Sequence, residues 1–257
     1  MHAMMRAASL VAGTFTFLSL LVACSSFMGE DPPATSSPAE AGTNASDAAG
    51  PLADAGVDGC VLLVHDDFSD EAASRARWRL LGTARIADAA AELTPNEAGA
   101  TGAMWLNLDE ARPGVLRATF TAKILVDEGA NGADGLAFAW AANRDVPLGG
   151  GGGYYGVCGN AADGLATVMS SLSKEVRLYD VNAGCTQQAG EAASVYGTNE
   201  LHVTVTSDRV HVTVSDRPYE FPSPRAVNVR SIGFSAGTGL WHARHAIDDV
   251  RVEACPP

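Results

Sequence analysis

Apolar and polar residues alternate with a period of two over several stretches of the chain. The clearest stretch is 116–126, in which every second residue is apolar and most of the residues between them are polar. Successive side chains of a strand point to opposite faces, so this pattern predicts a strand with one face in the core and the other in water. The same alternation recurs over 201–206 and 210–215, and the short turn between them predicts a hairpin.

Shorter apolar stretches, separated by Gly, Pro and Asn, predict the remaining strands. They lie at 61–64, 85–87, 91–94, 104–108, 133–140, 154–158, 164–170, 175–179, 229–236 and 246–253. A single helical turn is predicted at 71–77. Many short strands with almost no helix favour an all-β fold, an antiparallel sandwich of two sheets.

Residues 1–23 predict a secretory signal peptide, because Arg6 gives a short basic start and 7–22 is an apolar run. A run of this length is marginal for spanning a bilayer. Leu21-Val22-Ala23-Cys24 resembles the bacterial lipobox, which implies that Cys24 carries a lipid such as palmitate and becomes the mature N-terminus. A chance cysteine after an ordinary signal peptide is the alternative.

The next stretch has the composition of a linker. Residues 25–58 contain no Lys or Arg and are rich in Pro, Ala, Ser, Thr, Gly and Asp, so they bury too little apolar surface to fold. Residues 24–59 are therefore predicted to be a lipidated cysteine and a disordered acidic tether, followed by a folded domain over 60–257. These features predict an exported protein of the bacterial cell envelope, anchored to a membrane by lipid.

Composition and charge narrow the class of protein and of partner. The chain has 257 residues, 47% of them hydrophobic, and 27 glycines, which suits one globular domain with many turns. Its formal net charge of −13 argues against nucleic acid as a partner, because the phosphates would be repelled.

The chain has five cysteines. If Cys24 carries lipid, Cys60, Cys158, Cys185 and Cys255 remain, and an even number in an exported protein predicts two disulfides. Three pairings are possible. A zinc site is the alternative, but no two of these cysteines have the Cys-x-x-Cys spacing.

The stretch 133–156 combines a strand pattern with a glycine loop. Its first part alternates bulky residues with Gly and Ala, which predicts a strand with one bulky face and one bare face that something can approach. Asp134 stands at the start of this strand. Residues 149–153 are five consecutive glycines, which supply backbone freedom and unshielded N–H groups beyond the needs of an ordinary hairpin.

These residues resemble the legume-type (L-type) lectins of the concanavalin A-like superfamily. The resemblance lies in Ala-Asp-Gly-Leu-Ala-Phe at 133–138 and in the Gly-Gly element before Tyr154. A second match is Ile-Gly-Phe-Ser-Ala-Gly-Thr-Gly-Leu at 232–240, followed by His-Ala-Ile-Asp at 245–248. The matches occur in the family's order, and the resemblance covers about 66–253.

The resemblance implies a jelly-roll sandwich with a carbohydrate-binding site at its edge, formed by Asp134, Gly152, Gly153, Tyr154, Leu240 and Trp241. The Asp would accept hydrogen bonds from sugar hydroxyls, and the backbone N–H groups of the two glycines would donate to the same sugar. The indole would cover the apolar side of a sugar ring, and Tyr154 or Tyr155 would add a wall. Each has a structural alternative: the Asp as a turn cap, the glycines as a flexible hairpin and the indole as core.

The resemblance also implies a disulfide pairing and an oligomeric state. Cys60–Cys255 is favoured because the first and last strands are neighbours in the lectin-like sandwich, which leaves Cys158–Cys185 across adjacent central strands. Many members of the family pair edge to edge, so a homodimer is possible.

In the family, Ca and Mn are held by a Glu and an Asp on the strand after the glycine loop, followed by Asp, Asn and His ligands. Here that strand, 165–171, carries only neutral residues. A hard cation needs carboxylate oxygens, so we expect that the metal site is lost and that the protein has no cofactor. Our hypothesis is that the Cys158–Cys185 link stiffens this region instead.

The superfamily also contains glycoside hydrolases, whose retaining chemistry needs two carboxyl groups about 5 Å apart. No strand in this sequence has the alternating Glu and Asp that would supply them, and no nucleophile elbow or nucleotide loop is present. His245 and Asp248 lie on the last predicted strand, and the adjacent pair Asp248 and Asp249 is interpreted as a turn feature at a strand end and not as a catalytic dyad. His202 and His211 are interpreted as solvated surface. We therefore expect no catalysis.

The sequence thus predicts an exported, lipid-anchored, non-catalytic protein that binds glycans or polysaccharide in one shallow site. The alternative is a structural or adhesion surface lipoprotein that kept the fold and lost the site.

Overall fold

The computed structural model describes residues 59–256, except 113–114, 128–130, 161 and 183. The predicted signal peptide, Cys24 and all but the last residue of the predicted tether lie outside the described residues. Among the helices of the described part, none has the length and apolar character needed to cross a membrane.

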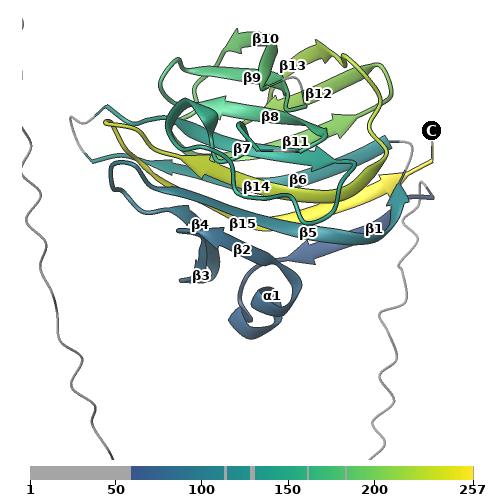
Figure 1. Ribbon diagram of the computed structural model, residues 1–257, viewed down its shortest axis with the longest axis horizontal. Coiled ribbons are helices and arrows are strands. Elements are labelled where there is room, and N and C mark those ends of the chain that lie inside the picture. Colours follow the sequence, from purple (N-terminus) through teal and green to yellow (C-terminus); the bar gives the residue numbers. More distant parts are fainter. Residues whose placement is uncertain (1–58, 113–114, 128–130, 161, 183, 257) are drawn as a thin grey trace, which may run out of the picture. The chain divides into compact units, whose positions relative to one another are not determined.

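Two antiparallel sheets share one core (Figure 1). The eight-stranded sheet has the order β13-β12-β11-β6-β15-β4-β3, with β1 paired to β15. Its strands are β1 (Val61–Asp66), β3 (Arg85–Ala87), β4 (Ala90–Thr94), β6 (Val115–Leu125), β11 (Gly197–Val205), β12 (Arg209–Val214), β13 (Arg217–Pro222) and β15 (Arg244–Cys255). The strand predicted at 116–126 is confirmed as β6, which buries alternate residues and pairs with β11 and β15.

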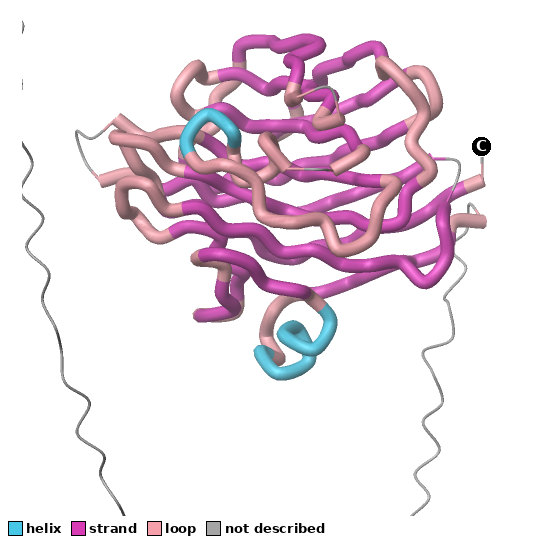
Figure 2. Tube along the Cα trace, viewed as in Figure 1, coloured by secondary structure: helices cyan, strands magenta, loops and turns pink. Residues whose placement is uncertain are grey.

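The seven-stranded sheet has the order β10-β9-β8-β7-β14-β5-β2. Its strands are β2 (Arg79–Gly82), β5 (Thr101–Arg112), β7 (Gly135–Ala141), β8 (Gly164–Ser170), β9 (Glu175–Asp180), β10 (Thr186–Ala192) and β14 (Val229–Gly237). Figure 2 shows how little of the chain is helical: α1 (Glu71–Arg77), at the predicted place, and the short 3-10 helix η1 (Gly152–Tyr154). The predicted antiparallel two-sheet sandwich is confirmed.

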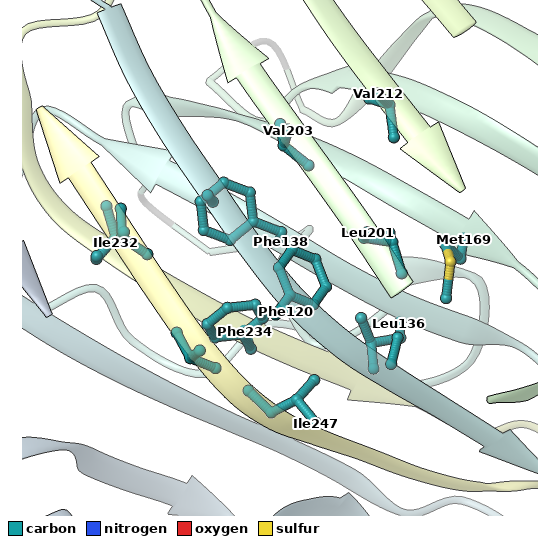
Figure 3. Close-up of a cluster of buried hydrophobic side chains, with 14 of the residues drawn as sticks. Phe120, Leu136, Phe138, Met169, Leu201, Val203, Val212, Ile232, Phe234 and Ile247 are labelled. Atoms are coloured by element: carbon teal, nitrogen blue, oxygen red, sulfur yellow. The ribbon is translucent and has the colours of Figure 1, made fainter. Parts of the chain in front are cut away.

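Three phenylalanines from both sheets meet at the centre of the sandwich (Figure 3). Phe120 of β6 lies 4.8 Å from Phe234 of β14 between ring centroids, and Phe138 of β7 lies 5.2 Å from Phe234. The bulky face predicted for 133–140 is therefore core. β7 pairs with β14 up to Gly135↔Gly237, which places Asp134 beside the end of β14.

The opposite face of β7 is also covered. Ala137 and Ala139 are buried in a second apolar cluster with Val168 of β8 and with Val146 and Val157 from the loop between β7 and β8. The sequence predicted that this face of β7 would be open to a ligand. The loop between β7 and β8 covers it instead, because the small side chains leave room for a second layer.

The segment 154–158 was predicted to be a strand. It contains instead the last residue of η1 and the turns after it. This changes the setting of one disulfide. Cys60–Cys255 joins the ends of the paired strands β1 and β15, as the resemblance implied. Cys158–Cys185 also forms, but it joins the glycine loop to the turn before β10 and not two adjacent strands.

Candidate functional site

Backbone hydrogen bonds fix Asp134 from two sides. Its N–H donates to the Gly237 carbonyl at the end of β14 (3.0 Å), and its carbonyl accepts from the N–H groups of Ser171 (2.9 Å) and Leu172 (3.5 Å) after β8. The Ala133–Asp134 peptide bond is cis. The position of the Asp134 side chain is therefore set by the ends of both strands that flank β7 in the sheet.

The Asp134 carboxylate lies against glycine backbone. A Cβ on Gly239 would lie 3.0 Å from Oδ2 of Asp134, and one on Gly152 would lie 3.5 Å from the same atom. The residue is 7% exposed, and Oδ2 has no hydrogen-bond partner within the described part of the chain. Burial raises the pKa of Asp134, and the Gly239 N–H only partly opposes that rise. The carboxylate has acceptor capacity that the protein leaves unused.

The glycine loop is well tied rather than a flexible hairpin. The N–H of Gly149 donates to Gly156, that of Gly150 to Cys158 and that of Gly156 back to Gly150, each at 2.8 Å between nitrogen and oxygen. The N–H of Gly152 donates to the Thr238 carbonyl at 3.1 Å. The expectation of a free donor at Gly152 is therefore wrong.

Gly153 is the open position of this loop. A Cβ added there would meet no heavy atom within 4 Å. Among the backbone hydrogen bonds of the described residues, none uses the Gly153 N–H. Of the two glycines predicted to donate, Gly153 thus offers a free N–H, while Gly152 supplies close backbone approach to the carboxylate.

Thr238 is a residue that the sequence interpretation left without a role. Its hydroxyl donates to the Glu97 carbonyl (2.6 Å) and accepts from the Ala100 N–H (2.8 Å), while its own N–H donates to the Ala100 carbonyl (2.8 Å). Since its carbonyl also receives the Gly152 N–H, Thr238 ties the glycine loop to the chain between β4 and β5. The Thr-Gly pair of the 232–240 motif was the feature of the sequence that could have pointed to this role of Thr238.

Large exposed apolar side chains occur on the segments that supply the site. Five such residues occur in the described part: Leu125, Tyr154, Leu172, Leu240 and Trp241. Four of them directly follow a residue of the site, and Leu125 is the exception. Leu172, whose N–H reaches Asp134, is one that sequence reasoning missed.

The exposed fractions decide between the alternatives for the aromatic residues. Trp241 is 53% exposed and Leu240 95%, so the indole is not core. The Trp241 carbonyl accepts the Gly239 N–H at 3.2 Å, which ties this turn to the residue against Asp134. Tyr154 is 55% exposed, whereas Tyr155 is 3% exposed and cannot form a wall.

The residues present do not fit a hard cation. Within the described residues, a single group of three or more clustered metal-ligand side chains occurs, Cys60, Glu253 and Cys255, and its two cysteines form a disulfide. On β8, where the family's acidic pair was expected to be missing, Ala166 and Val168 are buried in the second apolar cluster. Neither side chain offers an oxygen ligand, and the Ser170 hydroxyl at the end of β8 accepts a hydrogen bond from Tyr155.

The remaining candidates do not join the site. His245 is fully buried, Nδ1 lies 2.7 Å from Oγ1 of Thr94, and burial lowers the pKa of His245 to about 3, so it is a neutral core residue. The strand end predicted at Asp248 and Asp249 is wrong, because both lie inside β15 at the irregularity between Asp248 and Arg251. Asp248 pairs with Lys123 at 3.0 Å. His202 and His211 are exposed, as predicted.

No known family model matches the sequence, and no curated protein matches it. Solved structures do. The Ca2+-bound VIP36 exoplasmic/lumenal domain matches at 18% identity and TM-score 0.61, over 76% of this chain and 90% of that one. Basic winged bean lectin with Tn-antigen matches at 18% identity and TM-score 0.61, over 71% and 94%.

Arcelin-5, a lectin-like defense protein from Phaseolus vulgaris, matches at 17% identity and TM-score 0.59, over 69% of this chain and 92% of that one. This chain has a legume-lectin-like fold. At such low identity the likeness concerns the fold alone, so the case for a site rests on the residues described above. The same VIP36 domain also matches in a metal-free form and in Ca2+/mannose-bound forms.

Proposed function

We propose that this protein is an exported, non-catalytic carbohydrate-binding protein, anchored to a bacterial membrane by lipid on Cys24, and that it binds a glycan at Asp134. The observation that carries the proposal is a buried carboxylate that has an oxygen without a partner among the described residues and that lies against the backbone of Gly152 and Gly239. The structural neighbours add support, since VIP36 and winged bean lectin were solved with a mannose and with Tn-antigen, respectively.

Each group has a distinct task in this proposal. The Asp134 carboxylate accepts hydrogen bonds from vicinal hydroxyls of the sugar, and charged acceptors make the stronger bonds. The free Gly153 N–H donates to a hydroxyl oxygen, and Trp241 lies over the apolar side of the ring. One shallow site binds weakly, so many copies on a membrane would supply avidity.

The surroundings of Asp134 support a role in binding rather than in catalysis. Retaining glycoside hydrolysis needs a second carboxyl about 5 Å away, and a nearby carboxylate would raise the pKa of Asp134 through its charge. The rise in the pKa of Asp134 comes from burial, and among the described residues no charged neighbour contributes to it.

A glycan array tests the proposal. We expect the wild-type protein to bind a defined group of glycans, and Asp134→Ala to lose about 100-fold in affinity, or about 3 kcal/mol for two hydrogen bonds to a charged group. Asp249→Ala is the control, because it also removes a carboxylate, one that is exposed. This variant should bind as wild type. Silence of the wild-type protein across plant, bacterial and host glycans would instead support a structural or adhesion lipoprotein.

The anchor is tested separately. Cells expressing the full chain should incorporate an alkyne-labelled fatty acid into the protein, and Cys24→Ser should abolish the label while leaving the folded domain intact. Equal labelling of the two would contradict acylation at Cys24.

A further inference from the structure

The glycine loop is held against β8 and β9 by a buried phenol. Tyr155, directly after η1, donates its hydroxyl proton to Oγ of Ser170 at the end of β8 (3.3 Å). Ser170 immediately precedes Ser171, whose N–H holds the Asp134 carbonyl. Burial raises the pKa of Tyr155 to about 12, so the phenol keeps its proton at neutral pH.

A guanidinium completes this contact on the same face. Arg177 of β9 donates to the hydroxyls of Tyr155 (3.3 Å) and Tyr179 (3.1 Å) and to the Glu175 carboxylate (2.6 Å). A fixed positive charge beside Asp134's supporting residues disfavours a divalent cation there. The single carboxylate on this part of β9 is already paired with the guanidinium.

The Cys158–Cys185 disulfide holds the other end of the loop. The Cys158 carbonyl accepts the Gly150 N–H (2.8 Å), and its N–H donates to the Tyr154 carbonyl (2.9 Å). Val157 and Cys158 are buried in the second apolar cluster, over Ala166 and Val168. The loop is therefore anchored by covalent, apolar and polar contacts within the chain.

We infer that the Asp134 site is assembled without a metal ion, and that Tyr155, Arg177 and the Cys158–Cys185 disulfide are the positioning groups that order the glycine loop beside it. The inference rests on the proposed function for what the site binds. The order of the loop can be measured without any ligand, so the two can fail independently.

Amide hydrogen exchange of the full domain is the first test. Peptides covering 149–158 should be protected in EDTA, and millimolar Ca2+ or Mn2+ should leave their exchange rates unchanged. Added metal that slows exchange of these peptides about tenfold would overturn the inference, whether or not the protein binds a glycan.

Paired disulfide variants separate local order from global stability. Cys158→Ala/Cys185→Ala should speed exchange of 149–158 about tenfold and weaken glycan binding about tenfold. Cys60→Ala/Cys255→Ala is the matched control: it opens a longer loop, with a sequence separation of 195 against 27, so it should lower Tm at least as much. The Cys60→Ala/Cys255→Ala variant should leave exchange at 149–158 and glycan affinity unchanged. Equal effects of the two double variants on exchange at 149–158 would contradict the inference.

Tyr155→Phe removes the hydroxyl and keeps the ring. We expect exchange at 149–158 to rise about threefold or more, with a matching loss of glycan affinity. Tyr219→Phe, which removes another largely buried hydroxyl whose bond goes to Ala192, should affect neither. If the wild-type protein binds no glycan but these exchange results hold, the proposed function fails and the metal-free assembly stands.

Discussion

Replacing Asp134 with Asn is predicted to stabilise the fold while it removes glycan binding. The carboxylate is buried, and its Oδ2 has no partner within the described residues. Burial raises the pKa of this carboxyl above its ordinary value of 3.8, and the Gly239 N–H opposes that rise only in part. Asn keeps the shape of the side chain and removes the charge that burial penalises.

The size of the gain follows from the unpaired oxygen. An unsatisfied buried polar group costs about 1–3 kcal/mol, and partial compensation by the Gly239 N–H places the expected gain in unfolding free energy at about 1 kcal/mol. For a domain of this size the gain corresponds to about 2–4 °C in Tm.

The gain should depend on pH with a defined sign. Because the folded-state pKa of Asp134 is raised, wild type loses stability as pH rises from the unfolded-state pKa through the folded-state pKa. The amide of the variant does not titrate, so Asp134→Asn has its full advantage above the folded-state pKa and none below the ordinary value of 3.8.

Thermal unfolding at pH 7 and near pH 3 measures the gain in stability and its dependence on pH. Glycan binding at pH 7 measures the loss of affinity. Asp248→Asn is the control, since it removes the partly buried ion pair with Lys123 and should cost about 1 kcal/mol without changing binding. A lower Tm for Asp134→Asn at pH 7 would mean that the carboxylate stabilises the chain as a turn cap, and the reasoning would be refuted.

Three further predictions concern the surroundings of the site and the core. Gly239→Ala places a Cβ 3.0 Å from Oδ2 of Asp134 and should lower glycan affinity about tenfold by calorimetry, with little change in Tm. Trp241→Ala should cost about 1 kcal/mol of binding but not of stability, because the indole is half-exposed. Burial lowers the pKa of His245 from 6.5 to about 3, so the free energy of unfolding should fall as the pH is lowered from 6.5 toward 3. Urea denaturation at a series of pH values measures this fall, which should be smaller in His245→Gln.

The strands with strict alternation could be predicted from the sequence, whereas the edge strands β2, β10 and β13 could not. β6, β11 and β12 alternate because one face of each packs in the core. β10 is polar and largely exposed along its length, so no apolar period marks it. β13 contains two prolines, which normally argue against a strand but are tolerated at an edge such as this one.

The candidate site was predictable by residue type and not by hydrogen bonding. The motif named Asp134 and Gly152, and a Cβ on Gly152 would lie 3.5 Å from Oδ2 of that carboxylate. Nothing local to the sequence reveals that the Thr238 carbonyl takes up the Gly152 N–H, since the two residues are far apart along the chain. The difference between a buried Tyr155 and an exposed Tyr154 likewise depends on the left-handed turn at Tyr155, with φ 53°.

The covalent bond between Cys60 and Cys255 has a mechanical consequence if the domain is pulled from its N-terminal side. Load transmitted through the chain before residue 60 enters at β1, whose pairs with β15 run from Val61↔Ala254 to Asp66↔Val250. Without the bond, tension would peel these strands apart one pair after another from the Val61 end. The bond closes that end, so a force applied at Cys60 passes to both strands and cannot separate them pair by pair from Val61.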